Sequence, residues 1–414
     1  MANLCSIELC KIQFNPCKII FALLRNAPHI PFEMRTKPAD QTVLLASILL
    51  QLRGQQATSR SSLAKVTNLS PSTVGIYVDH LLSLGYVNES GLEQGAMGRP
   101  QRKLTLNPDI GWFVGVEFNA ERVQAVRVDF AGNLISSIVR PLPPGVTTSV
   151  VLEEIRQSIH ALARVAPGNL MSIGVGVPGL VNAASGMAMH YSFIPDWRDV
   201  PMVQTLKKEF PVTVTMENNL RAIALAERWF GGGRHLDDYV ILGPRRGFGV
   251  AIMKNGQLVR GGHQAAGEIG RWPWPLDGTG GEVHDELTAS AVWQKLAGAP
   301  QDATLPADLR SALHAYADEA GVVWQQIITD YARVIGILHL LLDAKTYFLH
   351  GPLTALGNRF CQEITERSIQ LMPALRSMPP EIVPSDLGDE AGALGAASLA
   401  MEAWVPDLNG TKVG

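Results

Sequence analysis

The spacing of apolar residues divides the chain into a helical N-terminal part and a longer part in which strands and helices alternate. Over residues 59–87 the apolar positions recur three or four residues apart, which predicts two short helices joined by a turn. Ser59 and Ser70 are suited to cap the two helices, and Pro71 fits the first position of the second one. Gly85 then ends that helix. The stretch therefore predicts a helix–turn–helix.

A β-hairpin is expected directly after the second helix. Tyr86 and Val87 begin a strand, residues 91–98 are rich in glycine, and residues 99–108 return as a second strand. Two helices followed by such a hairpin are the pattern of a winged helix–turn–helix. Residues 41–107 are therefore assigned to this domain.

A helix–turn–helix places the first residues of its second helix in the major groove of double-stranded DNA. The residues predicted to face the bases are Ser72, Thr73, Gly75 and Ile76. Arg99, Arg102 and Lys103 lie in the predicted wing, where they can reach phosphates. Residues 41–107 hold six basic and three acidic residues in a chain whose net charge is −3, so any contact with DNA must be local. A helical hairpin whose basic loop contacts protein is the alternative.

Strands dominate after residue 108, and their order repeats. Residues 108–235 and residues 236–386 each begin with three predicted antiparallel strands and continue into alternating strands and helices. The repeat predicts two related α/β lobes with a cleft between them, and such clefts favour small ligands. In the second half, helices are expected at about 286–296, 321–342, 355–372 and 388–403. The last of these lies in residues 387–414, which are assigned to a helix returning to the first lobe and a tail.

Residues 1–40 show no regular spacing and are expected to form an irregular extension. Their apolar run over residues 19–24 is shorter than a signal-peptide core, and the run over residues 334–342 is shorter than a membrane span. The chain has no C-x-x-C, and its four cysteines are Cys5, Cys10, Cys17 and Cys361. This spacing indicates neither a disulfide framework nor a zinc knuckle. The sequence therefore predicts a cytoplasmic protein without a membrane segment.

The glycines at positions 174, 176 and 179 match a dinucleotide-binding fingerprint. That fingerprint needs a helix directly after the glycines, because the helix N-terminus holds the pyrophosphate. Pro178 and the turn-forming residues after Gly179 do not begin a helix. The sequence therefore predicts no bound dinucleotide, and no other cofactor is expected.

Several segments of the longer part resemble the ROK family, whose name joins repressors, open reading frames and kinases. They are GVGVPGLV at residues 174–181, MENNLRAIALAE at 216–227, GGHQAAGEIGR at 261–271, ELTAS at 286–290 and DEAGALGAASLA at 389–400. The resemblance covers about residues 110–403 and implies a two-lobed, actin-like and hexokinase-like ATPase fold. The Gly98-Arg99-Pro100 wing in front of it is similar to that of the family's transcriptional regulators.

The segments that correspond to the ATP-binding loops of the family's kinases lack required residues. The D-x-G-G-T loop corresponds to Glu117–Ala120, where side chains replace the glycines that let backbone N–H groups close on phosphate. The second phosphate loop corresponds to Pro244–Gly249 and keeps only part of the G-T-G-x-G pattern. The resemblance places the kinases' catalytic aspartate at Asn219, and an amide cannot act as a general base near neutral pH. No catalytic residue is assigned, and the chain is not expected to be an enzyme.

Many members of the family hold a zinc ion with the histidine of G-E-I-G-H and a following cluster of cysteines. Arg271 replaces that histidine, and residues 272–286 contain no cysteine. A tetrahedral zinc site therefore has too few ligands, and no metal is predicted. His263 and His284 are expected to be hydrogen-bonding residues.

The positions that contact sugar hydroxyls in the family correspond to Asn218, Asn219, Glu268 and Glu286. Carboxylates and amides suit a polyol because they accept hydrogen bonds from, or donate them to, adjacent hydroxyls. Arg271 adds a guanidinium that can bind an anionic sugar derivative bidentately. The alternative is that Glu268 and Glu286 only cap loops or pair with Arg271.

These assignments predict a DNA-binding transcriptional regulator, a repressor rather than an activator, of carbohydrate-metabolism genes. A sugar or sugar derivative in the cleft is expected to change the angle between the lobes, and with it the spacing of DNA-binding domains in a homodimer or homotetramer. The operator is then a pseudo-palindrome. The alternatives are an ATP-dependent sugar kinase with an appended DNA-binding domain and a scaffold that catalyses nothing.

Overall fold

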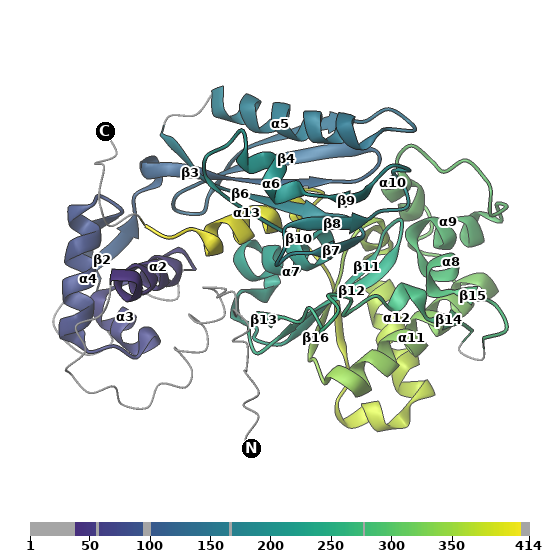
Figure 1. The fold of residues 1–414 in the computed structure, drawn as a ribbon. Helices are drawn as coiled ribbons and strands as arrows, with labels where there is room; N and C mark the ends of the chain where they lie inside the picture. The colour runs from purple at the N-terminus through teal and green to yellow at the C-terminus, as the bar shows by residue number, and fades with distance from the viewer. Residues whose placement is uncertain (1–37, 55–57, 94–100, 165–167, 276–277, 407–414) are drawn as a thin grey trace, which may run out of the picture. The chain divides into compact units, whose positions relative to one another are not determined.

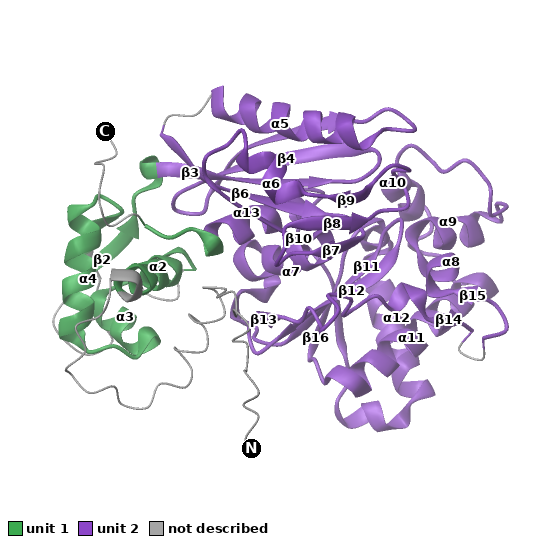
Figure 2. Ribbon diagram, viewed as in Figure 1, with its two compact units in different colours: residues 1–110, 402–414 green, residues 111–401 purple. Residues whose placement is uncertain are grey.

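The computed structural model describes residues 38–54, 58–93, 101–164, 168–275 and 278–406. They form two compact units (Figure 2): the first contains residues up to Ile110 together with those after Met401, and the second contains Gly111–Met401. No helix among these residues is long and apolar enough to span a lipid bilayer. Most of the predicted extension over residues 1–40 lies outside the described residues.

The described residues of the first unit include three α-helices and an antiparallel hairpin (Figure 1). They are α2 (Pro38–Arg53), α3 (Arg60–Thr67), α4 (Pro71–Ser83), β1 (Val87–Glu93) and β2 (Gln101–Leu106). The order of these elements is compatible with the predicted winged helix–turn–helix.

Polar caps set the ends of α3 and α4 where the sequence predicts them. The Ser59 side chain accepts from the backbone N–H of Ser62, and the Ser62 side chain bonds back to the Ser59 backbone. Asn68 ends α3 in the left-handed region, with a φ of 54°. The Ser70 side chain accepts from the Thr73 backbone N–H at 3.1 Å. Each cap satisfies a backbone N–H group that the helix itself leaves without a partner.

Apolar side chains at the predicted helical spacing form the core of the first unit. The fully buried ones include Leu63, Val74, Val78 and Leu81. Leu82, which the sequence places on the same face, is only partly buried. The segment after Met401 adds Trp404, whose ring meets the Tyr86 ring edge-on with centroids 5.6 Å apart. The end of the chain thus contributes to the folding of its N-terminal unit.

Two five-stranded sheets of the same topology form the second unit (Figure 1). The first sheet has the order β10-β6-β3-β4-β5, and the second has the order β13-β12-β11-β16-β17. In each sheet three consecutive antiparallel strands are followed by two strands parallel to the first of them. This repeat confirms the two related α/β lobes that the sequence predicts.

The strands of the first sheet are β3 (Gly111–Phe118), β4 (Arg122–Asp129), β5 (Leu134–Pro141), β6 (Asn169–Val177) and β10 (Thr213–Asn218). Those of the second sheet are β11 (Tyr239–Pro244), β12 (Phe248–Lys254), β13 (Gln257–Leu258), β16 (Thr346–Leu349) and β17 (Glu381–Pro384). Two small sheets add β7 (Leu180–Asn182), β8 (Met187–His190), β9 (Arg198–Val200), β14 (Pro273–Trp274) and β15 (Gly281–Glu282).

The helices of the first lobe are α5 (Thr148–Arg164), α6 (Met202–Lys207) and α7 (Asn219–Phe230). The second lobe contributes α8 (Val283–Leu287), α9 (Ala289–Ala297), α10 (Leu309–His314), α11 (Val322–Leu342) and α12 (Gly357–Leu371), and α13 (Ala391–Ala403) follows. The helix predicted at about 286–296 is present but divided into two, α8 and α9. The chain breaks at Thr288, whose side chain caps α9 by accepting from the Ala291 backbone N–H.

Helix α13 lies directly on the first sheet, and two glycines make this approach possible. A Cβ atom at Gly115 would lie 2.0 Å from the Ala393 carbonyl oxygen, and one at Gly174 would lie 1.8 Å from that of Ala396. Gly174 therefore serves helix packing. Gly179 has a φ of +74° and leads into the strand β7, so no helix follows the glycine motif.

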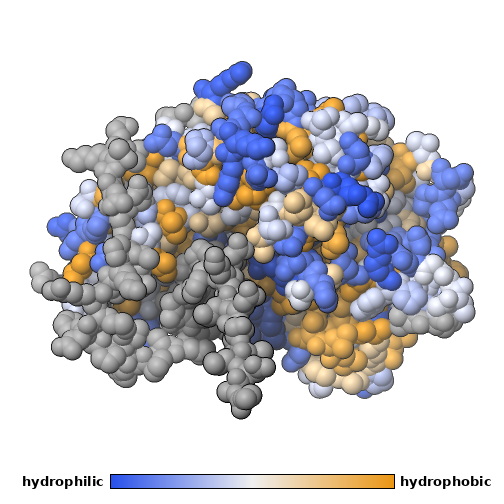
Figure 3. Space-filling view, in the orientation of Figure 1, coloured by the Kyte–Doolittle hydropathy of each residue, from blue (hydrophilic) through white to orange (hydrophobic). Residues whose placement is uncertain are grey.

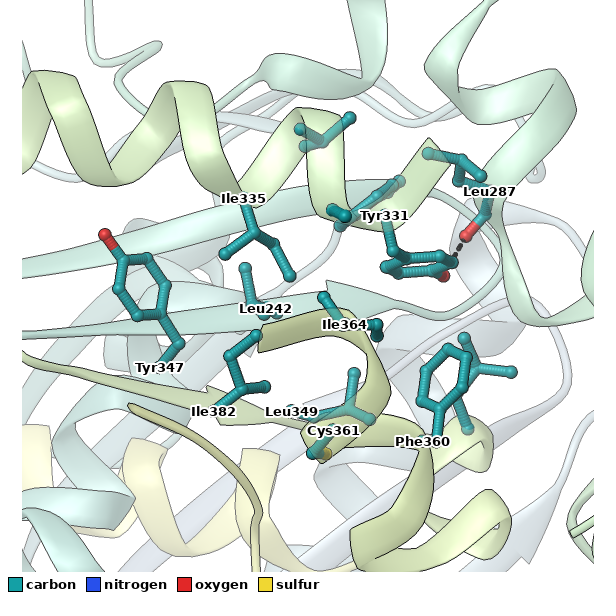
Figure 4. Packing of buried hydrophobic residues seen from close by; sticks show 14 of the residues in the cluster. Leu242, Leu287, Tyr331, Ile335, Tyr347, Leu349, Phe360, Cys361, Ile364 and Ile382 are labelled. Atoms are coloured by element: carbon teal, nitrogen blue, oxygen red, sulfur yellow. Dashed lines mark hydrogen bonds between the residues drawn. The ribbon is translucent and has the colours of Figure 1, made fainter. Parts of the chain in front are cut away.

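In the core of the second lobe, α11 and α12 pack on β11 and β16 (Figure 4). The Tyr331 side chain is fully buried there, and its hydroxyl donates to the Leu287 carbonyl. Burial raises the pKa of Tyr331 well above its usual value. The space-filling view shows apolar residues gathered on the surface near these helices (Figure 3). Near the end of α11, Leu341 is 70% exposed.

Candidate functional site

A cavity of about 1330 Å³ opens between the two lobes of the second unit. Its walls come from the ends of β6 and β10, the start of α7, the turn between β11 and β12, the segment before η3 (Ile269–Arg271) and the loop after β16. The fold thus brings together segments that lie far apart in the sequence. Four of the five residues predicted to bind a sugar line this cavity: Asn218, Asn219, Glu268 and Arg271.

Asn218 connects two segments of the cavity wall, the start of α7 and the loop after β6. It ends β10 beside Val177 of β6 and caps α7, where its Oδ1 accepts from the backbone N–H groups of Leu220 at 3.0 Å and Arg221 at 3.3 Å. Its Nδ2 donates to the Gly179 carbonyl oxygen at 2.9 Å. The side chain is 8% exposed. These bonds leave one amide proton for a ligand, so Asn218 is first a structural residue.

Asn219 donates a hydrogen bond to a carboxylate whose ion pair joins the lobes. Its Nδ2 donates at 3.1 Å to Oε1 of Glu117, which is 1% exposed at the end of β3. The Arg245 guanidinium, from the turn after β11, donates to the same oxygen with both Nη atoms at 3.2 Å. A buried carboxylate with three donors is well compensated. The two segments expected to correspond to phosphate loops are thus joined by a salt bridge.

Glu268 lies on a loop that two glycines hold against β12. The Gly267 carbonyl accepts from the Val250 backbone N–H at 2.9 Å. Gly267 has a φ of +91°, and a Cβ there would lie 1.9 Å from the Val250 carbonyl oxygen. A Cβ at Gly270 would lie 2.2 Å from the carbonyl oxygen of Phe248. The close contact of the loop leaves the Glu268 side chain exposed at the cavity wall.

His284 is a further cavity residue that the sequence indicated only as a hydrogen-bonding group, and this prediction is confirmed. Its Nδ1 accepts from the Phe248 backbone N–H at 2.7 Å, which places the proton of the neutral ring on Nε2. Burial and the nearby Arg271 guanidinium lower the pKa of His284. The ring is therefore neutral near pH 7 and has an N–H to donate.

Glu286 does not lie where the sequence suggested. It is not among the residues that line the cavity, and its carboxylate pairs with Lys295 of α9. Arg271 is 68% exposed and pairs with Glu282 at 3.6 Å. In the described part of the chain, the ion pair of Arg271 is thus with Glu282, and that of Glu286 is with Lys295. Glu286 belongs to the short helix α8, and its carboxylate is held by a residue of the next helix, α9.

Several further cavity residues were not predicted to bind a ligand. They are Arg122, Arg246, Arg310, His350 and Asp389. Asp389 pairs with both Arg122 and Arg310 at 3.5 Å. Among the described residues, no group of three or more His, Cys, Asp or Glu side chains is arranged to hold a metal ion.

The first unit places the residues predicted to face DNA on the start of α4. Ser72 is exposed, Ile76 is 69% exposed, and Thr73 is partly exposed beside the Ser70 cap. A Cβ at Gly75 would meet no atom within 4 Å. These residues therefore form one accessible face.

Charged residues of the first unit lie on α3, α4 and the hairpin, and several of them are paired. Arg102 is 71% exposed and donates to Glu89 at 2.7 Å, and Arg60 contacts both Glu89 and Asp79 at 2.8 Å. The hydrogen bond from Arg102 lowers the pKa of Glu89. Lys103 is exposed on β2. Arg99 lies outside the described residues.

Comparison with known proteins adds three findings. A family model described as the ROK family matches residues 113–403. The xylose repressor of Bacillus subtilis is 26% identical over 390 residues, which cover 88% of this chain and 96% of the repressor. The glucokinase of Thermotoga maritima is 27% identical over 253 residues, which cover 56% of this chain and 79% of the kinase.

A solved structure shares the fold of nearly the whole chain. It is a crystal structure of a ROK family transcriptional regulator, a homologue of the E. coli MLC protein, with a TM-score of 0.71. The match covers 88% of this chain and 96% of that protein at 19% sequence identity. The likeness extends through both units of the chain.

Proposed function

Because the chain belongs to the ROK family, we propose that it is a transcriptional repressor whose release from DNA is controlled by a sugar or sugar derivative. The xylose repressor and the regulator of similar fold support this function. One observation carries the proposal. The same chain contains a capped helix pair followed by a hairpin, and a cavity lined by amides and a carboxylate. The genes under control are those of carbohydrate metabolism.

The first unit is proposed to be a winged helix–turn–helix that places α4 in the major groove. Ser72, Thr73 and Gly75 then approach base edges, and the exposed Ile76 fits the methyl group of a thymine. Arg99, Arg102 and Lys103 of the wing bind phosphates. Arg60 and the exposed Lys65 of α3 add positive charge beside them.

Regulation is proposed to act through the ion pairs that cross between the lobes. Glu117 pairs with Arg245, Glu121 pairs with Arg246 at 2.9 Å, and Glu217 pairs with Arg260 at 2.6 Å. A ligand held by Asn219 and Glu268 shifts the lobe angle only as far as it binds one angle better than the other. Two or four copies of the chain then present their α4 helices to a pseudo-palindromic operator at changed spacing.

The cavity is proposed to bind without catalysing phosphoryl transfer. Asn219 lacks the basicity to take a proton from a sugar hydroxyl, and Glu117 and Arg245 occupy the segments where phosphate loops are expected. An ATP-dependent sugar kinase is the alternative, because a glucokinase is among the relatives. Incubation with labelled ATP and a panel of sugars tests it, and any labelled sugar would require the enzyme instead.

The purified full chain is to be mixed with sheared genomic DNA at about 0.15 M salt, where nonspecific phosphate contacts are weakened. We expect one enriched pseudo-palindrome and its release by members of a sugar panel that includes xylose. Ile76→Ala should lower affinity for that sequence by about tenfold. Val66→Ala, at a position 40% exposed on α3, is the matched control and should have no effect.

Two further variants separate the sites. Arg102→Ala should weaken DNA binding and leave sugar affinity unchanged, whereas Glu268→Ala should do the reverse. If the folded protein enriches no DNA sequence, the proposed DNA binding is contradicted. If it enriches a sequence but no sugar releases the DNA, the proposed control by a sugar is contradicted.

A further inference from the structure

His350 is a buried side chain without a partner at the cavity wall. It follows β16, and its backbone N–H donates to the Leu242 carbonyl at 2.8 Å. Its ring is only 5% exposed, and neither Nδ1 nor Nε2 has a hydrogen-bond partner within the described part of the chain. Buried polar atoms are almost always hydrogen-bonded. A ring with two unused nitrogens that lines a cavity therefore indicates a ligand group.

Two arginines neighbour the next residue, Gly351: Arg245 packs directly against it, and Arg310 reaches it through Thr354. Both guanidiniums act electrostatically on the His350 ring. Gly351 has a φ of +96°, and a Cβ there would lie 3.0 Å from Cγ of Arg245. On another side, Arg310 Nη1 donates to Oγ1 of Thr354 at 2.7 Å, and that hydroxyl donates to the Gly351 carbonyl at 2.9 Å. Arg245, Arg310 and His350 all line the same cavity.

The two arginines have donor capacity left. Arg245 directs both of its Nη atoms to a single oxygen of Glu117. Arg310 is 43% exposed and contacts Asp389 at 3.5 Å, and Asp389 is itself 63% exposed and shared with Arg122. Long, exposed and shared ion pairs contribute little stability. A ligand anion can therefore take over the donors of Arg310 at small cost.

We propose that Arg245, Arg310 and His350 form an oxyanion subsite that binds a phosphate or carboxylate group. The cavity, at about 1330 Å³, exceeds the roughly 300–1,000 Å³ typical of small-ligand pockets. It has room for this group beside a polyol at Asn219 and Glu268. Arg271 lines the same cavity but is paired with Glu282, and it is not assigned to the subsite. That the anion belongs to the regulating ligand rests on the proposed function, whereas the subsite itself does not.

Electrostatics support the geometry. The charged groups that act on His350 are Arg245, Arg310 and Asp389, and burial together with the two guanidiniums lowers the pKa of His350 to about 3. The ring is therefore neutral near pH 7 and donates from one nitrogen to an oxyanion that the guanidiniums also bind. The anion in turn offsets the charge of the guanidiniums.

The test is thermal unfolding of the full chain in inorganic phosphate, compared with chloride at equal ionic strength. A ligand that binds only the folded state raises the melting temperature in proportion to its affinity. We expect stabilisation that saturates in the millimolar range. Arg310→Gln should weaken the apparent affinity by about tenfold or more, and His350→Phe should also weaken it.

Arg333→Gln is the matched control, because Arg333 is 45% exposed and pairs with Asp330 at 3.3 Å on α11 outside the cavity. It should leave the phosphate effect unchanged. No stabilisation by phosphate, or equal losses in the Arg310 and Arg333 variants, would overturn the subsite.

Further arms identify the source of the anion and separate this inference from the proposed function. If phosphate competes with sugar phosphates for the protein, the anion is part of the ligand, whereas additive stabilisation by a neutral sugar and phosphate indicates a free anion. If neutral sugars release the DNA and phosphate does not stabilise the protein, the proposed function is supported and the subsite is contradicted.

Discussion

The ion pair between Glu117 and Arg245 allows a quantitative prediction for Asn219→Asp. This substitution replaces an amide by a carboxylate of nearly the same shape. In the native protein the Asn219 amide donates to Glu117 at 3.1 Å. The variant loses a hydrogen bond to a charged acceptor, which contributes about 1.5–3 kcal/mol. It also places two carboxylates about 3 Å apart, a repulsion of about 5 kcal/mol at an effective dielectric constant near 20.

Two features of the site reduce this total. Arg245 donates to the same Glu117 oxygen and attracts the introduced carboxylate too. Asn219 is also only partly buried, so water solvates part of the new charge. We therefore expect the free energy of unfolding of the second unit to fall by about 2–4 kcal/mol.

Urea unfolding followed by tryptophan fluorescence measures the loss, because four buried tryptophans report on the second unit: Trp112, Trp197, Trp274 and Trp324. The variant should also show a characteristic pH dependence. Repulsion raises the folded-state pKa of the introduced carboxyl above its unfolded value, so the deficit against the native protein is full near neutral pH. It should shrink as the pH falls through that raised pKa toward about 4.

Asn133→Asp is the matched control for the same chemical change. The Asn133 amide donates to Asp129 at 2.9 Å, but Asn133 lies in an exposed turn between β4 and β5. Solvent screening there should hold the loss to about 1 kcal/mol or less. Equal losses in the two variants, or a deficit at Asn219 that does not change with pH, would refute the reasoning.

Three further predictions concern other parts of the chain. Gly267→Ala places a Cβ 1.9 Å from a strand carbonyl oxygen, and calorimetry should show sugar affinity weakened by about tenfold. Gly262→Ala is the control, because a Cβ there meets nothing within 4 Å, and it should leave sugar affinity unchanged. Equal sugar affinities of the two variants would exclude the loop from the site. The pKa of His350 is lowered from 6.5 to about 3, so the unfolded chain binds the proton first, and stability should fall by up to about 1.4 kcal/mol per pH unit below pH 6.5. In chloride buffer, His350→Phe should flatten that slope, and an unchanged slope would contradict the assignment. Trp404→Ala should destabilise the first unit by about 3–5 kcal/mol. The loss should appear as faster hydrogen exchange in α4, with sugar affinity unchanged. Unaffected hydrogen exchange would show that Trp404 does not stabilise this unit.

The sequence predicts best those features that short segments determine by themselves. The caps at Ser59 and Ser70 depend on hydrogen bonds within a few residues, and both are confirmed. The two lobes were predictable for a related reason. Each meander is built from neighbouring strands, and the same order of elements occurs twice.

Errors arose where a local pattern had more than one structural outcome. Apolar spacing near residue 290 suggested one helix, but the chain forms two helices divided at the Thr288 cap, and Glu286 of the first pairs with Lys295 of the second. The family resemblance supplied four polar positions for a sugar. Only the tertiary structure showed that Asn218 already spends most of its hydrogen bonds on the backbone around it.

The sequence by itself determined the helix pair, the repeated sheet order and the polar residues available for a ligand, because each depends on neighbours along the chain. Only the tertiary structure decided which of these residues meet. Glu117 and Arg245 come together from separate lobes, as do the arginines around Asp389. Likewise, only the tertiary structure shows that the ring nitrogens of His350 are buried and have no hydrogen-bond partner in the described part of the chain. Pairing and burial depend on how distant segments pack, and side-chain type and spacing do not contain that information.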